Sequence, residues 1–106
     1  MTSNKINQLQ LLQQNLQNIA AQKQQYENQI VEIDSALAEL STAEKAYQMV
    51  GKLMLAASPE KLIKELQEKK EVAELRLRNF TKQEDKLTQN LEETQKEVMG
   101  EFQGKK

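Results

Sequence analysis

The organisation of this chain depends on one stretch near its middle, AYQMVGKLMLAA at residues 46–57. Nearly every position of the stretch is apolar, Gly51 interrupts it once, and it ends at Ser58 and Pro59. Tyr, Val and Met suit a pleated strand, and Gly51 followed by Lys52 suits a two-residue turn whose first position needs a positive φ. The stretch therefore predicts a β-hairpin. A stretch of this length is also compatible with a buried helical turn.

The predicted hairpin is apolar on both faces. The alternation along the sequence places Tyr47, Met49, Leu53 and Leu55 on one face, with Val50 and Met54 on the other. An isolated two-stranded hairpin is marginal in water, and its edges present unpaired amides and carbonyls. We therefore expect an obligate oligomer in which hairpins from several chains close into a β-barrel platform. The expected oligomerisation residues are Tyr47, Met49, Val50, Gly51, Leu53, Met54 and Leu55.

Both flanks of the hairpin carry a heptad repeat. The apolar positions alternate between spacings of three and four, which average to the 3.5-residue period of a left-handed supercoil. Ser58 suits an N-cap and Pro59 the first helical position, so a second helix starts there. We expect one domain over residues 1–106, with helices over residues 4–44 and 59–102 around the hairpin at 46–57. The first seam consists of Leu9, Leu12, Leu16, Ile19, Lys23, Tyr26, Ile30, Ile33, Leu37 and Leu40, and the second of Ile63, Leu66, Lys70, Ala73, Leu77, Phe80, Glu84, Leu87, Leu91, Thr94 and Val98.

The two seams stay in phase when the second helix folds back on the first. Each a position of one helix then meets a d position of the other, so the expected fold is mainly α, a long antiparallel two-helix coiled coil with one central β-hairpin. Lys23 and Glu84 fall in adjacent layers on opposite helices; they either pair and set the register, or each extends to water independently. The expected layers are Leu40 with Ile63, Leu37 with Leu66, Ile33 with Lys70, Ile30 with Ala73, Tyr26 with Leu77, Lys23 with Phe80, Ile19 with Glu84, Leu16 with Leu87, Leu12 with Leu91 and Leu9 with Thr94.

Composition narrows the function classes. The chain has no Cys and no His, which excludes disulfides and Cys or His chemistry, and no catalytic, cofactor or metal site is expected. The charge is nearly balanced, with 15 basic and 16 acidic residues, so neither nucleic acid nor an anionic membrane is an expected partner. The apolar runs are far shorter than the roughly 20 residues of a membrane span, and no signal peptide is visible. We expect a soluble, cytoplasmic protein that is not an enzyme.

Apolar residues also gather near the free ends of the two predicted helices, which the antiparallel arrangement brings together. Some of them lie beside the seam rather than in it, so they cannot all pack between the helices. Apolar side chains at a solvated tip suggest a binding surface, and ordinary end-packing of a coiled coil is the alternative. The candidate binding residues are Ile6, Leu9, Leu11, Leu12, Val98, Met99 and Phe102.

The whole chain resembles the beta subunit of prefoldin. The resemblance is carried by Tyr47, Val50, Gly51 and Leu55 within a single hairpin between two helices of matching length. It implies a hexamer of two alpha-type and four beta-type subunits, with hairpins in a double β-barrel, and it favours an archaeal source. It also implies an ATP-independent chaperone that holds unfolded proteins at its coiled-coil tips and passes them to a group II chaperonin. The alternative is a structural coiled-coil tether that does not bind unfolded proteins.

Overall fold

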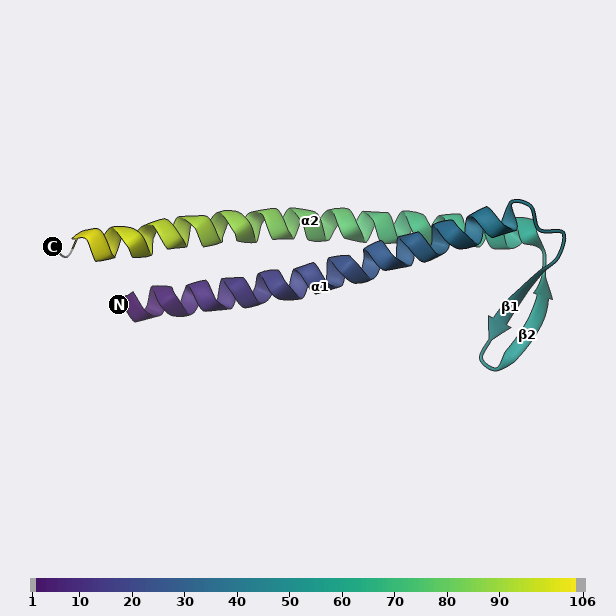
Figure 1. Cartoon of the computed structure of the whole chain (residues 1–106), viewed down its shortest axis with the longest axis horizontal. Coiled ribbons are helices and arrows are strands. Elements are labelled where there is room, and N and C mark those ends of the chain that lie inside the picture. Colours follow the sequence, from purple (N-terminus) through teal and green to yellow (C-terminus); the bar gives the residue numbers. More distant parts are fainter. Residues whose placement is uncertain (1, 105–106) are drawn as a thin grey trace. The chain divides into compact units, whose positions relative to one another are not determined.

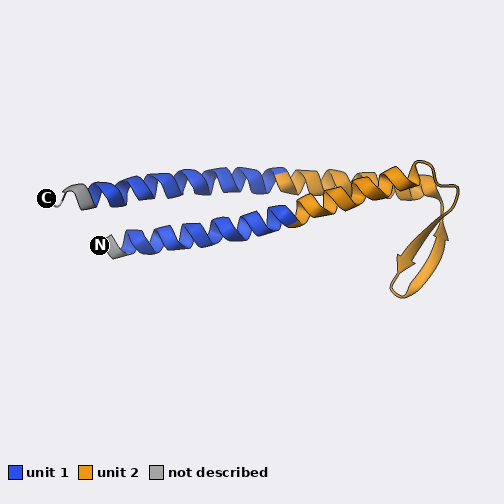
Figure 2. Ribbon diagram, in the orientation of Figure 1, with its two compact units in different colours: residues 1–24, 78–106 blue, residues 25–77 orange. Residues whose placement is uncertain are grey.

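The computed structural model describes the backbone of residues 2–104 and the side chains of residues 4–101. Along the chain, α1 (Thr2–Leu40) is followed by β1 (Ala46–Val50), β2 (Leu53–Ala57) and α2 (Pro59–Gly104) (Figure 1). The predicted fold class is confirmed: two long helices flank one two-stranded antiparallel hairpin. The chain divides into two compact units (Figure 2), the hairpin unit of residues 25–77 and the terminal unit of residues 1–24 and 78–106.

The first helix ends earlier than the sequence suggests. We expected residues 4–44, whereas α1 runs from Thr2 to Leu40. Its last turn is closed by Ser41, whose backbone N–H donates to the Leu37 carbonyl at 3.0 Å and whose Oγ donates to the Ala38 carbonyl at 2.7 Å. A serine that bonds back to helical carbonyls satisfies groups that would otherwise lack a partner. The helix can therefore stop without a Gly or Pro signal.

The second helix begins where the sequence predicts. The backbone N–H of Leu62 donates to the Ser58 carbonyl at 3.1 Å, which makes Ser58 the residue before the helix and Pro59 its first residue. Proline has no N–H to lose at that position, and Glu60 adds negative charge to the first turn, where the helix dipole favours it. At the other end α2 continues to Gly104, beyond the expected residue 102.

The core is the narrow seam between helices in each unit. All the seam residues predicted from the heptads are buried or half-buried, whereas most positions between them are exposed. The most buried are Ile33 at 6% and Ala73 at 2% in the hairpin unit, and Val98 at 8% in the terminal unit. No large side chain in the described part of the chain is fully buried, as expected for two helices that share a single line of contact.

Polar contacts across the seam agree with the predicted antiparallel register. In the hairpin unit, the Lys70 ammonium lies 2.7 Å from an Asp34 carboxylate oxygen, one residue from the predicted partner Ile33. In the terminal unit, Lys23 Nζ donates to Glu84 Oε1 at 2.9 Å. The pairing alternative for Lys23 and Glu84 is thereby confirmed, and the alternative in which both side chains extend separately to water is wrong.

The hairpin has the predicted turn but a different division of its faces. Val50 pairs with Leu53 across the turn, and Gly51 has a φ of 61°, the left-handed conformation that favours glycine. Residues directly opposite each other in an antiparallel ladder share a face. The two-residue turn sets an even-numbered residue of one strand opposite an odd-numbered residue of the other, as with Val50 and Leu53. The expected grouping of Tyr47 and Met49 with Leu53 and Leu55 is therefore wrong. One face carries Tyr47, Met49, Met54 and Ala56, and the other carries Gln48, Val50, Leu53 and Leu55.

Candidate functional site

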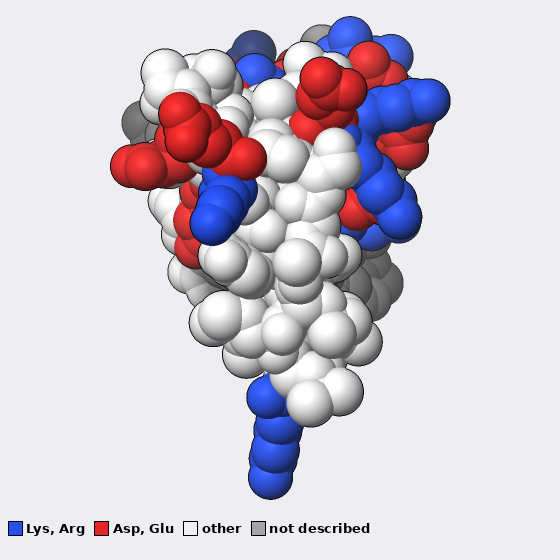
Figure 3. Space-filling view, turned by 90° about the vertical axis from the view of Figure 1, so that its right-hand side faces the viewer, with Lys and Arg blue, Asp and Glu red and all other residues white. Residues whose placement is uncertain are grey.

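The hairpin is the most exposed apolar surface of the hairpin unit. Figure 3 shows a broad area without Lys, Arg, Asp or Glu over the hairpin. Exposed apolar patches of this kind mark interaction surfaces in soluble proteins. The structure brings the expected oligomerisation residues together on this one element. The six large apolar side chains there are between 49% and 66% exposed: Leu55, Val50, Tyr47, Met49, Leu53 and Met54.

The hairpin leaves both of its faces and both of its edges uncovered by the rest of the described residues. Its sheet consists of β1 and β2 alone, so both outer edges carry backbone groups without a strand partner in the described part of the chain. Its two faces each present three large apolar side chains, so covering one face leaves the other exposed. Closing a sheet into a barrel pairs its edges and buries its inward face.

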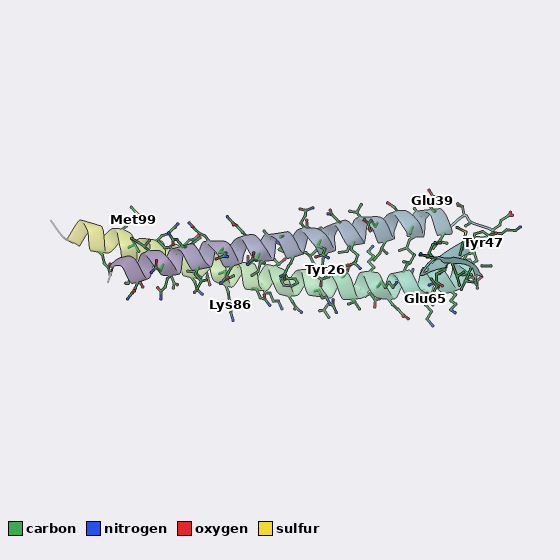
Figure 4. The ribbon with its side chains drawn as sticks, turned by 90° about the horizontal axis from the view of Figure 1, so that it is seen from below. Tyr26, Glu39, Tyr47, Glu65, Lys86 and Met99 are labelled. Carbon is green, nitrogen blue, oxygen red and sulfur yellow. The ribbon has the colours of Figure 1, made fainter. Side chains whose placement is uncertain are left out.

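The structure separates six of the seven candidate tip residues into two sets within the terminal unit. Leu9, Leu12 and Val98 occupy the seam, where they pack between the helices. Ile6, Leu11 and Met99 are 37%, 57% and 62% exposed, and Figure 4 shows Met99 on the outside of α2. The side chain of Phe102 lies outside the described residues. Some of the candidate residues therefore pack between the helices, and others are exposed to solvent.

A three-residue ion cluster, which we did not predict, joins the helices in the terminal unit. The Lys5 ammonium lies 2.9 Å from Glu97 Oε2 and 3.3 Å from Glu101 Oε1. The hydrogen bond to Glu97, and then that to Glu101, raises the pKa of Lys5 above its ordinary value of 10.5. The seam positions are spaced alternately by three and four residues. Continuing this spacing by one more position reaches Lys5 before Leu9 and Glu101 after Val98, so the heptad repeat could have predicted both residues.

The terminal unit also contains a groove beside its seam, with a volume of about 270 Å³. Leu11 and Leu12 contribute aliphatic surface, and Gln8, Asn90 and Thr94 contribute amide and hydroxyl groups. Among the described residues, no charged side chain lines it. Of its five lining residues, only Leu11 and Leu12 were among the candidates from the sequence. Gln8 and Asn90 come from seam-flanking positions that look like ordinary solvated surface, and Thr94 was assigned to the seam alone.

A larger groove, of about 450 Å³, lies in the hairpin unit and has a different character. Arg76 Nη1 donates to the Tyr26 hydroxyl at 3.2 Å, with its guanidinium 5.9 Å from the ring centroid. Figure 4 shows Tyr26 beside α2, where this contact forms. Four charged residues line this groove, namely Glu65, Glu68, Lys69 and Arg76. Their mutual attraction and their hydration favour a solvated surface over a site for an uncharged ligand.

The described residues contain neither a metal-binding cluster nor a membrane-spanning helix. No cluster of three or more acidic, His or Cys side chains is placed to hold a metal ion among residues 4–101. Neither helix, in the part that the structure describes, is long and apolar enough to cross a membrane.

These features define the class of the molecule: a helical coiled-coil protein with a single exposed β-hairpin between its helices. Comparison with known proteins then identifies the family. A family model described as "Prefoldin subunit" matches residues 3–105. The chain belongs to the prefoldin subunit family.

Individual relatives agree with this assignment. The prefoldin subunit beta of Archaeoglobus fulgidus is 38% identical over 98 residues, which cover 90% of this chain and 84% of that protein. The prefoldin subunit beta of Methanospirillum hungatei is 36% identical over 106 residues, covering 97% and 88%. The crystal structure of the prefoldin beta subunit from Thermococcus strain KS-1 matches with a TM-score of 0.88 at 31% identity, covering 93% of this chain and 90% of that one. The predicted resemblance to beta-class prefoldin is confirmed.

Family membership carries a general function with it. Prefoldins are chaperones, and a beta subunit is one component of a hetero-oligomeric prefoldin complex. The chain is therefore a chaperone subunit with a helical coiled-coil architecture.

Proposed function

We propose that this chain binds unfolded proteins through the terminal unit, without ATP, and that the assembled complex passes them to a group II chaperonin. The observation that carries the proposal is the exposure of Ile6, Leu11 and Met99 on the terminal unit of a chaperone subunit. Unfolded chains expose apolar side chains that native proteins bury, and an exposed apolar surface offers them contact. The glycines at positions 51, 100 and 104 do not form a phosphate loop, in keeping with a mechanism that uses no nucleotide.

The assembly that we propose is a hexamer of two alpha-type and four beta-type subunits. The exposed hairpins, apolar on both faces, support it, because hairpins joined edge to edge in barrels would pair their free edges and bury the inward face of each. Several arms would then contact one client, and multivalent contact gives high avidity from individually weak contacts. In the cell, we place this complex in the cytoplasm as a complex that acts before the chaperonin.

Suppression of aggregation tests client binding. The complex with an alpha-type subunit should keep a chemically denatured model protein from scattering light after dilution. Replacing the exposed pair Leu11→Ser and Met99→Ser should lower protection severalfold, because it removes apolar surface that the client would contact. Neither side chain packs in the seam, so the coiled coil should stay folded. The matched control is Val31→Ser and Val72→Ser, which removes apolar side chains that are equally exposed, at 64% and 50%, in the hairpin unit.

The outcomes are clear in both directions. Protection that survives the control but not the terminal substitutions supports the proposal, as does loss of protection when residues 1–8 and 99–106 are trimmed. An intact complex that gives no protection would support the structural tether instead.

Transfer to the chaperonin is tested separately. A group II chaperonin is added to a preformed complex with a labelled client, and the label is followed. A client that stays on the complex contradicts the transfer step.

A further inference from the structure

The first half of α1 has an unusual surface for a coiled-coil arm. Residues 6–22 contain no charged side chain, and their polar positions are mostly Gln and Asn. The two lysines that border this segment are both engaged across the seam, Lys5 with Glu97 and Lys23 with Glu84. This part of α1 therefore offers a surface that is polar and able to form hydrogen bonds but carries no charge.

The groove of the terminal unit lies along this uncharged segment of α1. Gln8, Leu11 and Leu12 come from α1, and Asn90 and Thr94 come from α2. Gln8 and Asn90 are exposed, so their amides are accessible from solvent. Thr94 occupies a seam position that an aliphatic residue would otherwise fill. Its small side chain leaves room beside the seam, and its hydroxyl adds a third polar group there.

The chemistry of this lining matches one kind of ligand. A side-chain amide carries both donors and an acceptor, as does the peptide backbone, and a hydroxyl can do either. Aliphatic side chains of Leu11 and Leu12 suit an aliphatic side chain of the ligand. A charged group placed here would lose hydration without gaining a counter-ion from the lining. The ligand that fits is an uncharged, extended segment of polypeptide with its backbone still unpaired.

We propose that this groove reads the backbone of the client. Gln8, Asn90 and Thr94 hydrogen-bond the exposed peptide groups of an extended, uncharged segment, while Leu11 and Leu12 hold one aliphatic side chain. The inference rests on the proposed function and adds to it a class of substrate. Recognition of backbone groups would allow one site to accept unrelated clients, because every unfolded chain presents those groups whatever its sequence.

Backbone methylation gives a direct test. The probes are a labelled ten-residue peptide of alternating Leu and Ser, and an analogue with the same side chains and N-methyl groups on every second amide. Binding to the complete complex is followed by fluorescence anisotropy. We expect the unmodified peptide to bind about tenfold more tightly, the effect of losing one or two neutral hydrogen bonds. In the variant Gln8→Leu with Asn90→Leu, the ratio should fall to about twofold or less.

A matched control separates this effect from a general change in the helix surface. Gln14→Leu with Gln89→Leu makes the same change at exposed positions outside the groove and should keep the tenfold ratio. All these substitutions introduce good helix formers, and circular dichroism checks the fold. Equal binding of both peptides to the native complex overturns the inference, as does failure to bind the unmodified peptide by a complex that suppresses aggregation. Failure to bind both the peptide and the denatured protein overturns the proposed function as well.

Discussion

The polar pair Lys23 and Glu84 shows how single residues shape a coiled coil. Their side chains are only 20% and 29% exposed, and the atoms that meet are 2.9 Å apart. Burying a polar pair in a seam removes water from both charges, and the charge-assisted hydrogen bond between them offsets part of that free-energy cost. The two groups can meet in one register only. An aliphatic layer packs almost equally well after a slip of one heptad. The contact is established, and its role in setting the register is a prediction.

Replacing the pair tests that role. Lys23→Leu or Glu84→Leu alone should destabilise the chain by about 1–2 kcal/mol, because the remaining charge loses its partner. The double variant should be as stable as the native chain or more stable, but less well defined in register. Disulfide formation reports the register: Leu16→Cys with Leu87→Cys forms the bridge in register, and Leu16→Cys with Thr94→Cys forms it only after slippage. A double variant that forms only the first bridge would show that the pair does not set the register.

The Lys5 cluster predicts a dependence on alkaline pH. Its pKa is raised by Glu97 and Glu101 above the ordinary 10.5, so its stabilising contribution is complete below about pH 10.5 and is lost as pH rises through the higher folded value. The difference in melting temperature between the native chain and Lys5→Met should therefore shrink as the pH rises above about pH 10.5. The effect is small, since the groups are exposed and screened by salt. Lys64→Met, at an exposed position, is the control. A difference that stays constant over this range would contradict the prediction.

At the scale of elements, each helix depends on its partner. In isolation, α1 or α2 would expose its whole seam, and most helical stability in proteins comes from packing one apolar face rather than from propensity. The ends are set by local chemistry, by Ser41 at the end of α1 and by Ser58 with Pro59 at the start of α2. The strands lack such a partner within the chain, because the hairpin pairs only with itself in the described residues.

At the scale of the whole molecule, the hairpin is the element on which the proposed assembly depends. Val50 and Leu53 lie directly opposite each other on one face of the ladder, and both are more than half exposed. Burial of such a face between chains would leave no water for a charged group, and the cost of burying an unpaired charge exceeds what one contact returns.

A charge on this face should therefore break the assembly. Val50→Asp or Leu53→Asp should dissociate the complex to small species, as measured by analytical ultracentrifugation, while circular dichroism still shows a largely helical chain. Lys52→Glu is the matched control, because the turn already carries a charged residue and should tolerate another. A hexamer that survives Val50→Asp would contradict the barrel.

Much of this fold was predictable because its signals are local or periodic. The alternation of seam residues specifies two helices and their antiparallel register, since a pattern with a period of 3.5 can bury its apolar positions only against a second such pattern. Ser58 and Pro59 mark a helix start, and Gly51 marks a turn that requires a positive φ. The same phase placed Lys23 and Glu84 in adjacent layers, and the structure decided that they pair.

The tertiary structure decided what depends on two segments at once. The two-residue turn determined which strand residues share a face, so Leu53 lies with Val50 and not with Met49. Leu11 and Leu12 are neighbours in the sequence, yet Leu12 packs in the seam while the exposed Leu11 lines a groove with Asn90 and Thr94. A heptad specifies which positions face the partner helix, but a groove forms only from the sizes of side chains that two distant segments bring together. The sequence by itself therefore determined the helices, the register and the hairpin, and only the structure could place the groove.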